Sequence, residues 1–513
     1  MAVLAGVAAL DTEAAQVKTG RARRPTVGLA LVVLAVALFL VHGSRTIAAP
    51  FGDSHDGRNA GVWAAGSRAL REHGPITSRL GTRSAEGGVY ANHPPLIYLE
   101  TAVAEWLGHG TRASTRAPAW LGSVVALALL ARLLGERSVR PNAVGVAVLL
   151  AATTPMFLVY GTMLDTPVSS LPFGVALLLE WERARAGGSV RPACAAGLAA
   201  LAVLAGWQAL LLSVAVGGWA ILRVARGRGR RVVELGFVAG ALTGAALLLA
   251  WLLWAFGGTL RPLVDQFVFR TGGSTHPVAF GSVLSAERRD ESAMFGVAGL
   301  LALAGIVVAL RSPVTRGLAA LALAVTVPYP IVFRSGTVNH NYWGYWFLLP
   351  VAVGLGAGAE AALRGWRSRG HQESAAVLAV AGMGVLLVVV AWVAPLGAES
   401  MKLNGYRAGE AAMHARLGPV QREAWYSGAV GVPPSWLSLA ARRPAVDLSP
   451  SRYVELAGSE PADLVLVGEV GCLAGADQRT YVLRTVGSLL DRPPAFAPCQ
   501  AEIAPQPASR TGR

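Results

Sequence analysis

Four residues that can carry out acid–base chemistry and bind phosphate follow the first apolar run of the chain. Asp53, His55, Asp56 and Arg58 lie within six positions of one another. A carboxylate can accept the proton of a hydroxyl nucleophile, and a guanidinium can bind phosphate through two parallel hydrogen bonds. A single aspartate at the end of an apolar run is most simply a solvated helix cap. Two aspartates beside a histidine and an arginine instead indicate a site.

Further polar residues recur at the ends of later apolar runs. His93 lies in the stretch YANHPPL, where two prolines restrict the neighbouring backbone. Asp165 ends the stretch PMFLVYGTMLD, and His340 and Tyr342 belong to the stretch NHNYW. A histidine between two asparagines favours a polar contact, whereas Tyr and Trp can equally form an interfacial aromatic belt. The arginines that can either bind a phosphate or anchor the chain at the interface are Arg58, Arg112, Arg116 and Arg270.

The composition predicts that membrane helices position these residues. Of the 513 residues, 53% are apolar and only 15% are charged, and the mean hydropathy is +0.48. Soluble domains seldom combine these properties. A bilayer core about 30 Å thick needs roughly 20 apolar residues per helix. Eleven runs of suitable size are predicted to cross, at 26–43, 117–134, 142–160, 166–181, 192–206, 207–223, 233–256, 293–310, 317–334, 342–363 and 375–396.

Arginines set the predicted orientation. The net charge of +15 rests on arginine, because Lys18 and Lys402 are the only lysines. The arginines cluster in alternate short connections, which is typical of cytoplasmic loops and not of a nucleic-acid-binding face. We therefore expect a multi-pass protein of the cell membrane with the N-terminal segment 1–25 in the cytoplasm. The first long loop, 44–116, and the chain after residue 396 are then expected outside.

The segment Pro94–Leu107 tests this scheme. It is apolar but short, and it contains Glu100 and Glu105. If it crossed the membrane, every later arginine cluster would change sides. We predict a short or re-entrant helix on the outer side, because non-spanning backbone is tolerated where protein covers it.

The chain after Pro395 changes character, since apolar runs shorten and prolines recur. The stretch 462–470 predicts one buried strand, with helices on either side, in a small extracytoplasmic α/β domain over 397–503. A disordered tail is expected at 504–513. Cys472 and Cys499 can form a disulfide if this region is outside, which the spacing alone leaves open.

The order of motifs along residues 26–365 resembles a known family. One apolar run is followed by an acidic residue in D-x-R-x-A, then by HPPL-x-Y-L, and then by R-x-P at 116–118. This order resembles the GT-C membrane glycosyltransferases, and within them the protein O-mannosyltransferase and aminoarabinose-transferase branch. The resemblance implies an all-α polytopic membrane fold. It also implies an enzyme that transfers a sugar from a polyprenyl-phosphate donor, with inversion at the anomeric carbon.

The resemblance also implies roles for individual residues. An acidic residue of the first outer loop acts as the general base in such enzymes, which makes Asp56 the first choice and Asp53 the second. Because Ser54 and His55 separate these two acids, whereas the family often has adjacent acids, the choice stays open. The residues expected to contact the donor or the acceptor are His55, Arg58, His93, Arg116, Asp165, Arg270, His340 and Tyr342.

The expected partners are a polyprenyl-phosphate-linked sugar, the lipid bilayer and a glycan, lipid or protein acceptor, with no nucleic acid. No metal ligands are predicted, although a divalent metal is compatible with the chemistry. No P-loop and no strand-placed GxGxxG occurs, which argues against an ATP-driven pump or a nucleotide-sugar enzyme. The alternative is a transporter or flippase of lipid-linked substrates, which predicts ionisable residues at mid-membrane and repeated halves. In this sequence the charges lie at the ends of the apolar runs.

Overall fold

A computed structural model describes residues 27–49, 51, 55–84, 88–137, 139–273, 277–370 and 373–393, together with four strands of the tail. These residues form two compact units. The first, which we call the helical unit, takes its residues from 1–48, 91–100 and 116–397. The second, which we call the loop unit, takes its residues from 49–90, 101–115 and 398–513.

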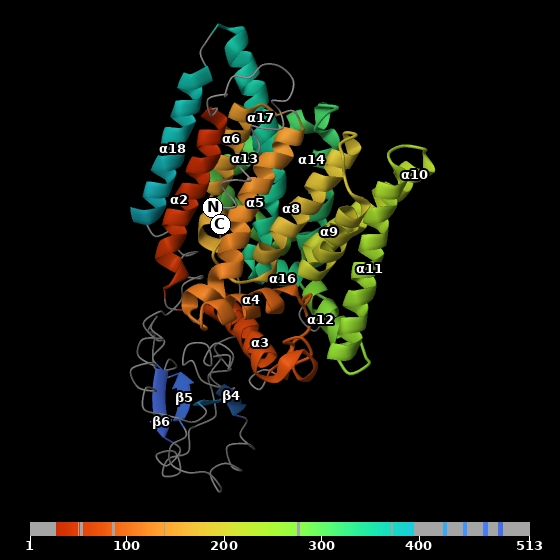
Figure 1. The fold of residues 1–513 in the computed structure, drawn as a ribbon. Coiled ribbons are helices and arrows are strands. Elements are labelled where there is room, and N and C mark those ends of the chain that lie inside the picture. The colour runs from red at the N-terminus through yellow and green to blue at the C-terminus, as the bar shows by residue number, and fades with distance from the viewer. Residues whose placement is uncertain are drawn as a thin grey trace. The chain divides into compact units, whose positions relative to one another are not determined.

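The helical unit is built from helices joined by short connections (Figure 1). Its helices are α2 (Val27–Ile47), α6 (Pro141–Ala152), α7 (Pro155–Tyr160), α8 (Thr166–Arg185), α9 (Pro192–Ala205), α10 (Trp207–Ala225), α11 (Arg231–Ala255), α12 (Arg261–Thr271), α13 (Phe280–Arg311), α14 (Arg316–Thr326), α15 (Pro328–Val332), α16 (Arg334–Asn339), the 3₁₀ helix η1 (Asn341–Phe347), α17 (Leu348–Ser368) and α18 (Glu373–Val393). Two helices contribute residues to both units, α4 (Leu96–Leu107) and α5 (Arg112–Glu136).

The protein is an all-helical multi-span membrane protein in this unit. Within the described residues, six helical stretches are long and apolar enough to cross a bilayer: α2, α5, α10, α11, α13 and the stretch from η1 through α17. Four shorter apolar stretches accompany them, at Pro141–Ala152, Pro192–Ala205, Arg316–Val332 and Ala376–Leu387. Each of the eleven predicted runs overlaps helical residues in the described part of the chain, but only six of the helical stretches there reach the length and hydropathy of a crossing.

Two predicted runs are broken where a proline starts a new helix. The run 142–160 is divided into α6 and α7, and α7 begins at Pro155 behind the Thr154 cap. The run 317–334 is divided into α14 and α15, and α15 begins at Pro328. Proline fits the first turn of a helix because it has no N–H group to donate to the preceding turn. Hydropathy alone does not register these breaks.

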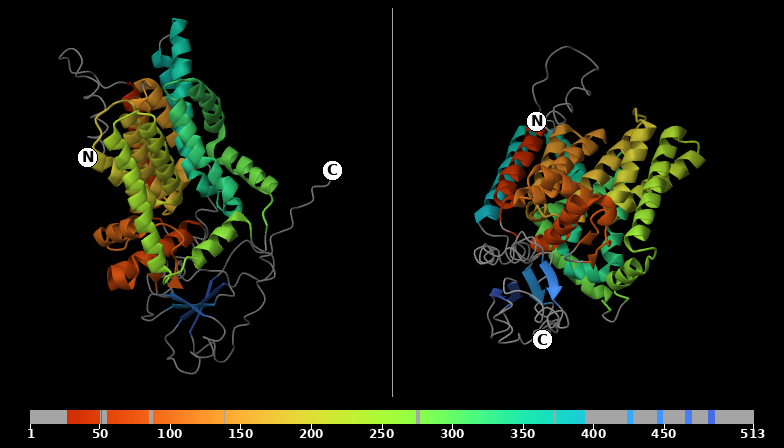
Figure 2. Two further views of the ribbon diagram at one scale, coloured as in Figure 1. Left: turned by 90° about the vertical axis from the view of Figure 1, so that its right-hand side faces the viewer. Right: turned by 60° about the horizontal axis from the view of Figure 1, so that its bottom comes forward.

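Small residues allow close helix packing in this unit. Gly236, Gly240 and Gly244 repeat every four residues along α11 and face the backbone of α9. A Cβ atom on Gly240 would collide with the carbonyl oxygen of Ala196. Such small residues at every fourth position bring two helices together in a membrane, where van der Waals packing drives association. Helices α2 and α18 also lie side by side, as Figure 1 and the right-hand view of Figure 2 show.

Gly240→Leu is expected to destabilise the protein strongly, because a backbone carbonyl cannot move aside for the added side chain as a flexible side chain can. Overpacking costs about 1–3 kcal/mol or more in a close-packed interior. Thermal unfolding of the purified protein, followed by size-exclusion chromatography, should show a lowered midpoint. Gly218→Leu on α10 is the matched control, since no atom lies within 4 Å of the position that its Cβ would take. Equal midpoints for the two variants would contradict the packing argument.

Arginines of the predicted cytoplasmic connections also pair with buried carboxylates. Arg137 pairs with Glu182, and Arg185 contacts the same carboxylate at 2.8 Å. Arg223 lies 2.7 Å from Glu234, whose side chain is almost fully buried. Ionised groups at such depth are stable only when they are paired. These arginines therefore join the ends of neighbouring helices in addition to any effect on orientation.

The loop unit contains α3 (His55–Thr77), whose last turn is kinked at Gly74 by a positive φ of 76°. A short antiparallel hairpin follows, formed by β1 (Arg83–Ser84) and β2 (Gly88–Val89). Helix α4 has 12 residues, which at 1.5 Å per residue gives a length of about 18 Å, too short to span a core about 30 Å thick. The helix is short, as predicted, and its place on the outer side stays a prediction.

The tail contributes a four-stranded sheet with the strand order β4-β3-β5-β6. The strands are β3 (Ala424–Ser427), β4 (Ala445–Leu448), β5 (Val465–Glu469) and β6 (Tyr481–Thr485). Strand β3 pairs parallel with β4 and β5, and β5 pairs antiparallel with β6. The strand predicted at 462–470 corresponds to β5. The predicted helices beside it, the tail at 504–513, Cys472 and Cys499 lie outside the described residues.

Candidate active site

At the start of α8, hydrogen bonds link Asp165 and Thr166 to His93, which lies before α4. Asp165 is the N-cap of this helix, and its Oδ1 accepts a hydrogen bond of 2.6 Å from the Thr166 backbone N–H. The Thr166 hydroxyl in turn lies 3.1 Å from His93 Nδ1. Aspartate suits this place because its carboxylate satisfies an N–H group that has no partner within the helix. Two predicted site residues, His93 and Asp165, are thus joined through a threonine that the sequence motifs did not single out.

The backbone beside His93 is fixed by a tryptophan. The indole N–H of Trp207, the first residue of α10, donates to the carbonyl of Asn92 at 2.8 Å. Pro94 and Pro95 follow directly and are buried. The Trp207 hydrogen bond before His93 and the two prolines after it restrict the backbone that carries the imidazole.

Burial keeps His93 uncharged. Desolvation, together with the positive charge of Arg270, lowers the pKa of His93 to about 3. At neutral pH the ring is therefore a neutral donor and acceptor, positioned to orient a hydroxyl group. The Arg270 charge that acts on this ring comes from α12.

The low pKa of His93 predicts a dependence of stability on pH. Between about pH 6.5, the ordinary histidine value, and about pH 3, the unfolded chain binds one more proton than the folded chain at this residue. The free energy of unfolding therefore falls as the pH is lowered through this window, by up to about 1.4 kcal/mol per pH unit. His93→Gln should show a smaller loss of melting temperature between pH 7 and pH 5 than the wild type. His73→Gln, at an exposed histidine, should lose as much melting temperature between pH 7 and pH 5 as the wild type does. Identical dependence of the melting temperature on pH in all three proteins would contradict the assignment.

A second group of site residues is centred on Arg270. Its Nη1 lies 2.9 Å from Nε2 of His340. A guanidinium only donates, so His340 Nε2 accepts and the neutral ring carries its proton on Nδ1. The guanidinium carbon lies 5.6 Å from the ring centre of Trp343, within reach of a cation–π attraction. The ring of Tyr342 lies 5.3 Å from that of His340.

The local sequence explains how these residues meet. Arg270 is in the last turn of α12, where the negative end of the helix dipole favours a cation, and Gly272 ends the helix with a φ of 79°. His340 separates α16 from η1 in a non-helical conformation. The next residue, Asn341, accepts a hydrogen bond of 2.7 Å from the Tyr160 hydroxyl at the end of α7. Tyr160 and Asn341 belong to the motif stretches, but their contact was not predicted.

The remaining predicted residues lie elsewhere. Arg116 is buried, and one of its contacts is a 3.2 Å hydrogen bond to the carbonyl of Ile47, the last residue of α2. This bond joins α5 to the end of α2, which is a structural role. In the loop unit, His55 is half-buried and Asp56 is buried in the first turn of α3, where the helix dipole favours an anion. Asp53 and the side chain of Arg58 lie outside the described residues.

The structure therefore brings five predicted residues into two groups in the helical unit, His93 with Asp165, and Arg270 with His340 and Tyr342. Among the described residues, no group of three or more His, Cys, Asp or Glu side chains is arranged to hold a metal ion. The two groups together offer a cation, two imidazoles and hydroxyl groups. Such groups can bind a phosphate and orient hydroxyls.

No protein-family profile and no curated protein matches the sequence. Solved structures do match. ArnT from Cupriavidus metallidurans bound to undecaprenyl phosphate superposes with a TM-score of 0.58 and 16% identity, over 88% of this chain and 98% of that chain. The same protein in the apo state superposes with a TM-score of 0.58 and 15% identity, over 91% of this chain and 99% of that chain. An oligosaccharyltransferase from Archaeoglobus fulgidus in the apo form superposes with a TM-score of 0.51 and 14% identity, over 83% of this chain and 65% of that chain.

The similarity covers most of the chain, although at identities this low it concerns the fold. It confirms the predicted resemblance to the aminoarabinose transferase ArnT and extends it to an archaeal oligosaccharyltransferase. The chain therefore shares the fold of ArnT over most of its length.

Proposed function

We propose that the protein transfers a sugar from a polyprenyl-phosphate donor to an acceptor hydroxyl at the outer face of the membrane. The observation that carries this proposal is the Arg270 group, in which a half-buried guanidinium is held by His340 and Trp343 and its charge acts on the neutral His93. The fold shared with a protein that was solved bound to undecaprenyl phosphate supports the same donor class.

The phosphate of the donor would bind to Arg270. A guanidinium carries five N–H donors, so the hydrogen bond to His340 leaves donors for two phosphate oxygens. Phosphate becomes more negative as the sugar leaves, and a fixed cation therefore stabilises the transition state more than the ground state. His93 and Tyr342 would orient hydroxyls of the sugar.

The general base would be Asp56, with Asp53 as the second choice. In the proposed step, the acceptor oxygen forms a bond to the anomeric carbon while the bond from that carbon to the phosphate oxygen breaks. The electron pair of the broken bond leaves with the polyprenyl phosphate, and the acceptor proton moves to the aspartate carboxylate. Attack opposite the leaving group inverts the anomeric carbon. His55 and Arg58 would contact the substrates from the same helix, and Arg116 would support the first loop.

The proposed topology follows from the arginine distribution. The N-terminus would lie in the cytoplasm, all eleven predicted runs would cross the membrane, and the tail domain would be extracytoplasmic. Cysteine labelling of residues 44–116 from outside intact cells tests it. Protection of these residues from a membrane-impermeant reagent would reverse the assignment.

The function is tested by incubating the purified protein in lipid nanodiscs with radiolabelled polyprenyl-phosphate mannose, arabinose or glucose and a membrane extract. We expect one of these labels to move into a glycan, lipid or protein fraction of the extract. A parallel sample of sealed proteoliposomes measures movement of the intact donor across the bilayer. Translocation without transfer would overturn the proposal in favour of a transporter or flippase, and no transfer from any donor would overturn the proposed donor class.

A further inference from the structure

Helix α10 begins with a buried amide that lacks a partner. Gln208, its second residue, is only 2% exposed. Its Nε2 makes no hydrogen bond to any residue in the part of the chain that the structure describes. A buried polar group without a hydrogen bond is costly and rare in native proteins. The Gln208 amide therefore needs a partner that these residues do not supply.

The backbone at this end of α10 offers donors as well. The first N–H groups of a helix have no partner within the helix. Gly206 is the N-cap of α10 and has no side chain that could accept from them, and both Gly206 and Ala209 are buried. Backbone and side chain thus present N–H donors at one place, where the helix dipole is also positive. Such a place favours an oxygen that can accept a hydrogen bond.

The start of α10 packs against the start of α8. A Cβ atom on Gly206 would lie 2.7 Å from Ser170 Oγ and 3.5 Å from the Thr166 carbonyl oxygen. The next residue, Trp207, donates from its indole to the Asn92 carbonyl at 2.8 Å. Helix α10 therefore begins beside the hydrogen-bonded residues at the start of α8, which belong to the candidate site.

Gln208 lies on the face of α10 that meets α8. Trp219 is 11 residues further along, which is about three helical turns, so the two residues share a face. The Trp219 ring lies 6.3 Å from that of Trp181 on α8. Ser213 lies on another face and donates to a carbonyl of α9 at 2.9 Å. The Gln208 amide is therefore turned toward the helix that begins with Thr166.

The neighbouring groups favour a hydroxyl as the partner of this amide. His93 is neutral, and Thr166 bonds to it through a hydroxyl. An amide N–H donates to a hydroxyl oxygen, and the hydroxyl can in turn donate to an acceptor beside it. Asp165, in the same place, carries a carboxylate that would repel an anionic ligand. A sugar, with several adjacent hydroxyls, fits these groups better than an anion does.

We propose that Gln208 determines specificity for the donor sugar by donating a hydrogen bond from Nε2 to one of the sugar hydroxyls. This role rests on the proposed transfer from a polyprenyl-phosphate sugar, and it concerns the sugar, whereas Arg270 would bind the phosphate. A sugar without that hydroxyl leaves the buried amide unpaired and is therefore bound less tightly.

The role is tested by comparing the binding of bare polyprenyl phosphate and of polyprenyl-phosphate mannose, arabinose or glucose to the full-length protein in lipid nanodiscs. The wild type should bind at least one sugar-linked lipid more tightly than the bare lipid. Gln208→Met keeps the length of the side chain and removes its donor. It should lower the affinity for that sugar-linked lipid about tenfold and leave the affinity for the bare lipid unchanged. Without donor, its melting temperature should rise, because an unpaired buried polar group is removed.

Ser213→Ala is the matched control on the same helix. It removes a buried hydroxyl that already has a partner, so it should bind both lipids as the wild type does. Wild-type affinity of Gln208→Met for the sugar-linked lipid would overturn the role of Gln208, especially with a lowered melting temperature, which would make the amide purely structural. An equal loss of affinity for both lipids, or a wild type that does not prefer any sugar-linked lipid, would overturn it as well.

Sugar transfer by the same samples separates this role from the proposed function. Transfer that continues while the sugar preference does not depend on Gln208 would overturn only the role of Gln208. A preference that depends on Gln208 without any transfer would overturn only the proposed function. Absence of binding of all these lipids would overturn both.

Discussion

Asp56→Asn is expected to reduce sugar transfer by about 10²–10⁴-fold, the range that a positioned general base contributes. Asparagine has nearly the same shape as aspartate and can still accept hydrogen bonds at the start of α3, but it cannot take the acceptor proton. The rate constant for transfer should therefore fall, while binding of the donor changes little. Initial rates of label transfer at saturating donor measure the first quantity, and donor affinity in the absence of acceptor measures the second.

Two further substitutions make this test specific. Asp53→Asn addresses the other acid of the first loop, and the larger loss of rate identifies the base. Asp165→Asn compares these acids with another carboxylate of the candidate site, which caps α8 through the Thr166 N–H at 2.6 Å. Asparagine is an equally good cap, so this variant should stay folded. Wild-type rates in both first-loop variants would refute a general base in that loop.

The sequence could predict the helices because each crossing requires a run of about 20 apolar residues. It could not predict how those helices are interrupted. The run 142–160 is continuous by hydropathy, yet Thr154 and Pro155 start a new helix inside it. The stretch after His340 begins as a 3₁₀ helix before α17. Such breaks depend on capping and proline geometry, which an average over many residues does not detect.

The candidate site could be predicted only in part, for a related reason. Asp165 and His340 stand out in the sequence because polar residues at the end of an apolar run are unusual. The bond between Arg270 and His340 joins residues 70 positions apart, and only the tertiary fold brings them together. Thr166 gives no signal at all, since a threonine at a helix start is common and its bond to His93 crosses 73 positions.

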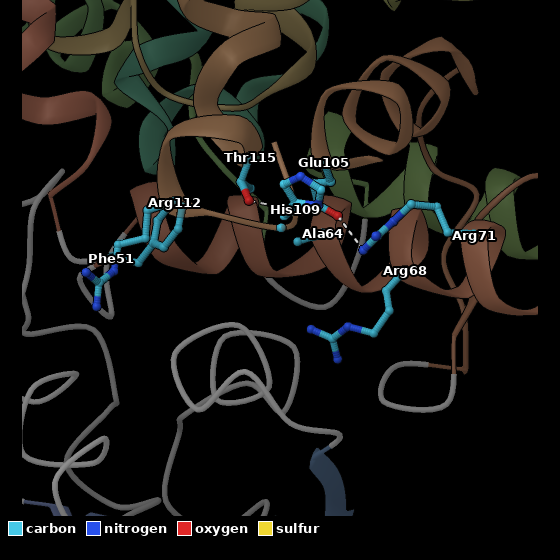
Figure 3. A pocket seen from close by; sticks show the side chains of 9 residues that line it. Phe51, Ala64, Arg68, Arg71, Glu105, His109, Arg112 and Thr115 are labelled. Atoms are coloured by element: carbon cyan, nitrogen blue, oxygen red, sulfur yellow. Dashed lines mark hydrogen bonds and ion pairs between the residues drawn. The ribbon is translucent and has the colours of Figure 1, made fainter. Parts of the chain in front are cut away.

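The loop unit also contains a cavity of about 210 Å³, lined in part by Arg68, Arg71 and Glu105 (Figure 3), which could not be predicted for the opposite reason. Its arginines are plain in the sequence, but arginines in this chain are numerous and mostly mark connections between helices. In the sequence, Glu105 is only a charge that argues against a membrane crossing. Its role becomes apparent from two hydrogen bonds, to Thr115 and Arg71, which come from helices on either side of it in the sequence.

Arg270→Gln is expected to lower kcat/KM for the donor on the order of 100-fold, because two charge-assisted hydrogen bonds to phosphate contribute about 3 kcal/mol together. Glutamine keeps a donor for the His340 ring, so the local structure should persist. Arg270→Lys should recover part of the loss, since an ammonium restores the charge but not the bidentate geometry.

The matched control for Arg270 lies on the same helix. Arg261 is 86% exposed at the start of α12 and pairs with Asp265 across one helical turn at 3.9 Å. An exposed pair of this kind contributes little to stability, so Arg261→Gln should transfer sugar at the wild-type rate.

If both glutamine variants lost activity equally, the effect would belong to the general charge of α12. If only Arg270→Gln did, and higher donor concentration restored its rate, the guanidinium would bind the donor phosphate. A loss that saturating donor cannot restore would instead assign Arg270 to the charge that develops on the departing phosphate, because only an interaction stronger in the transition state lowers kcat.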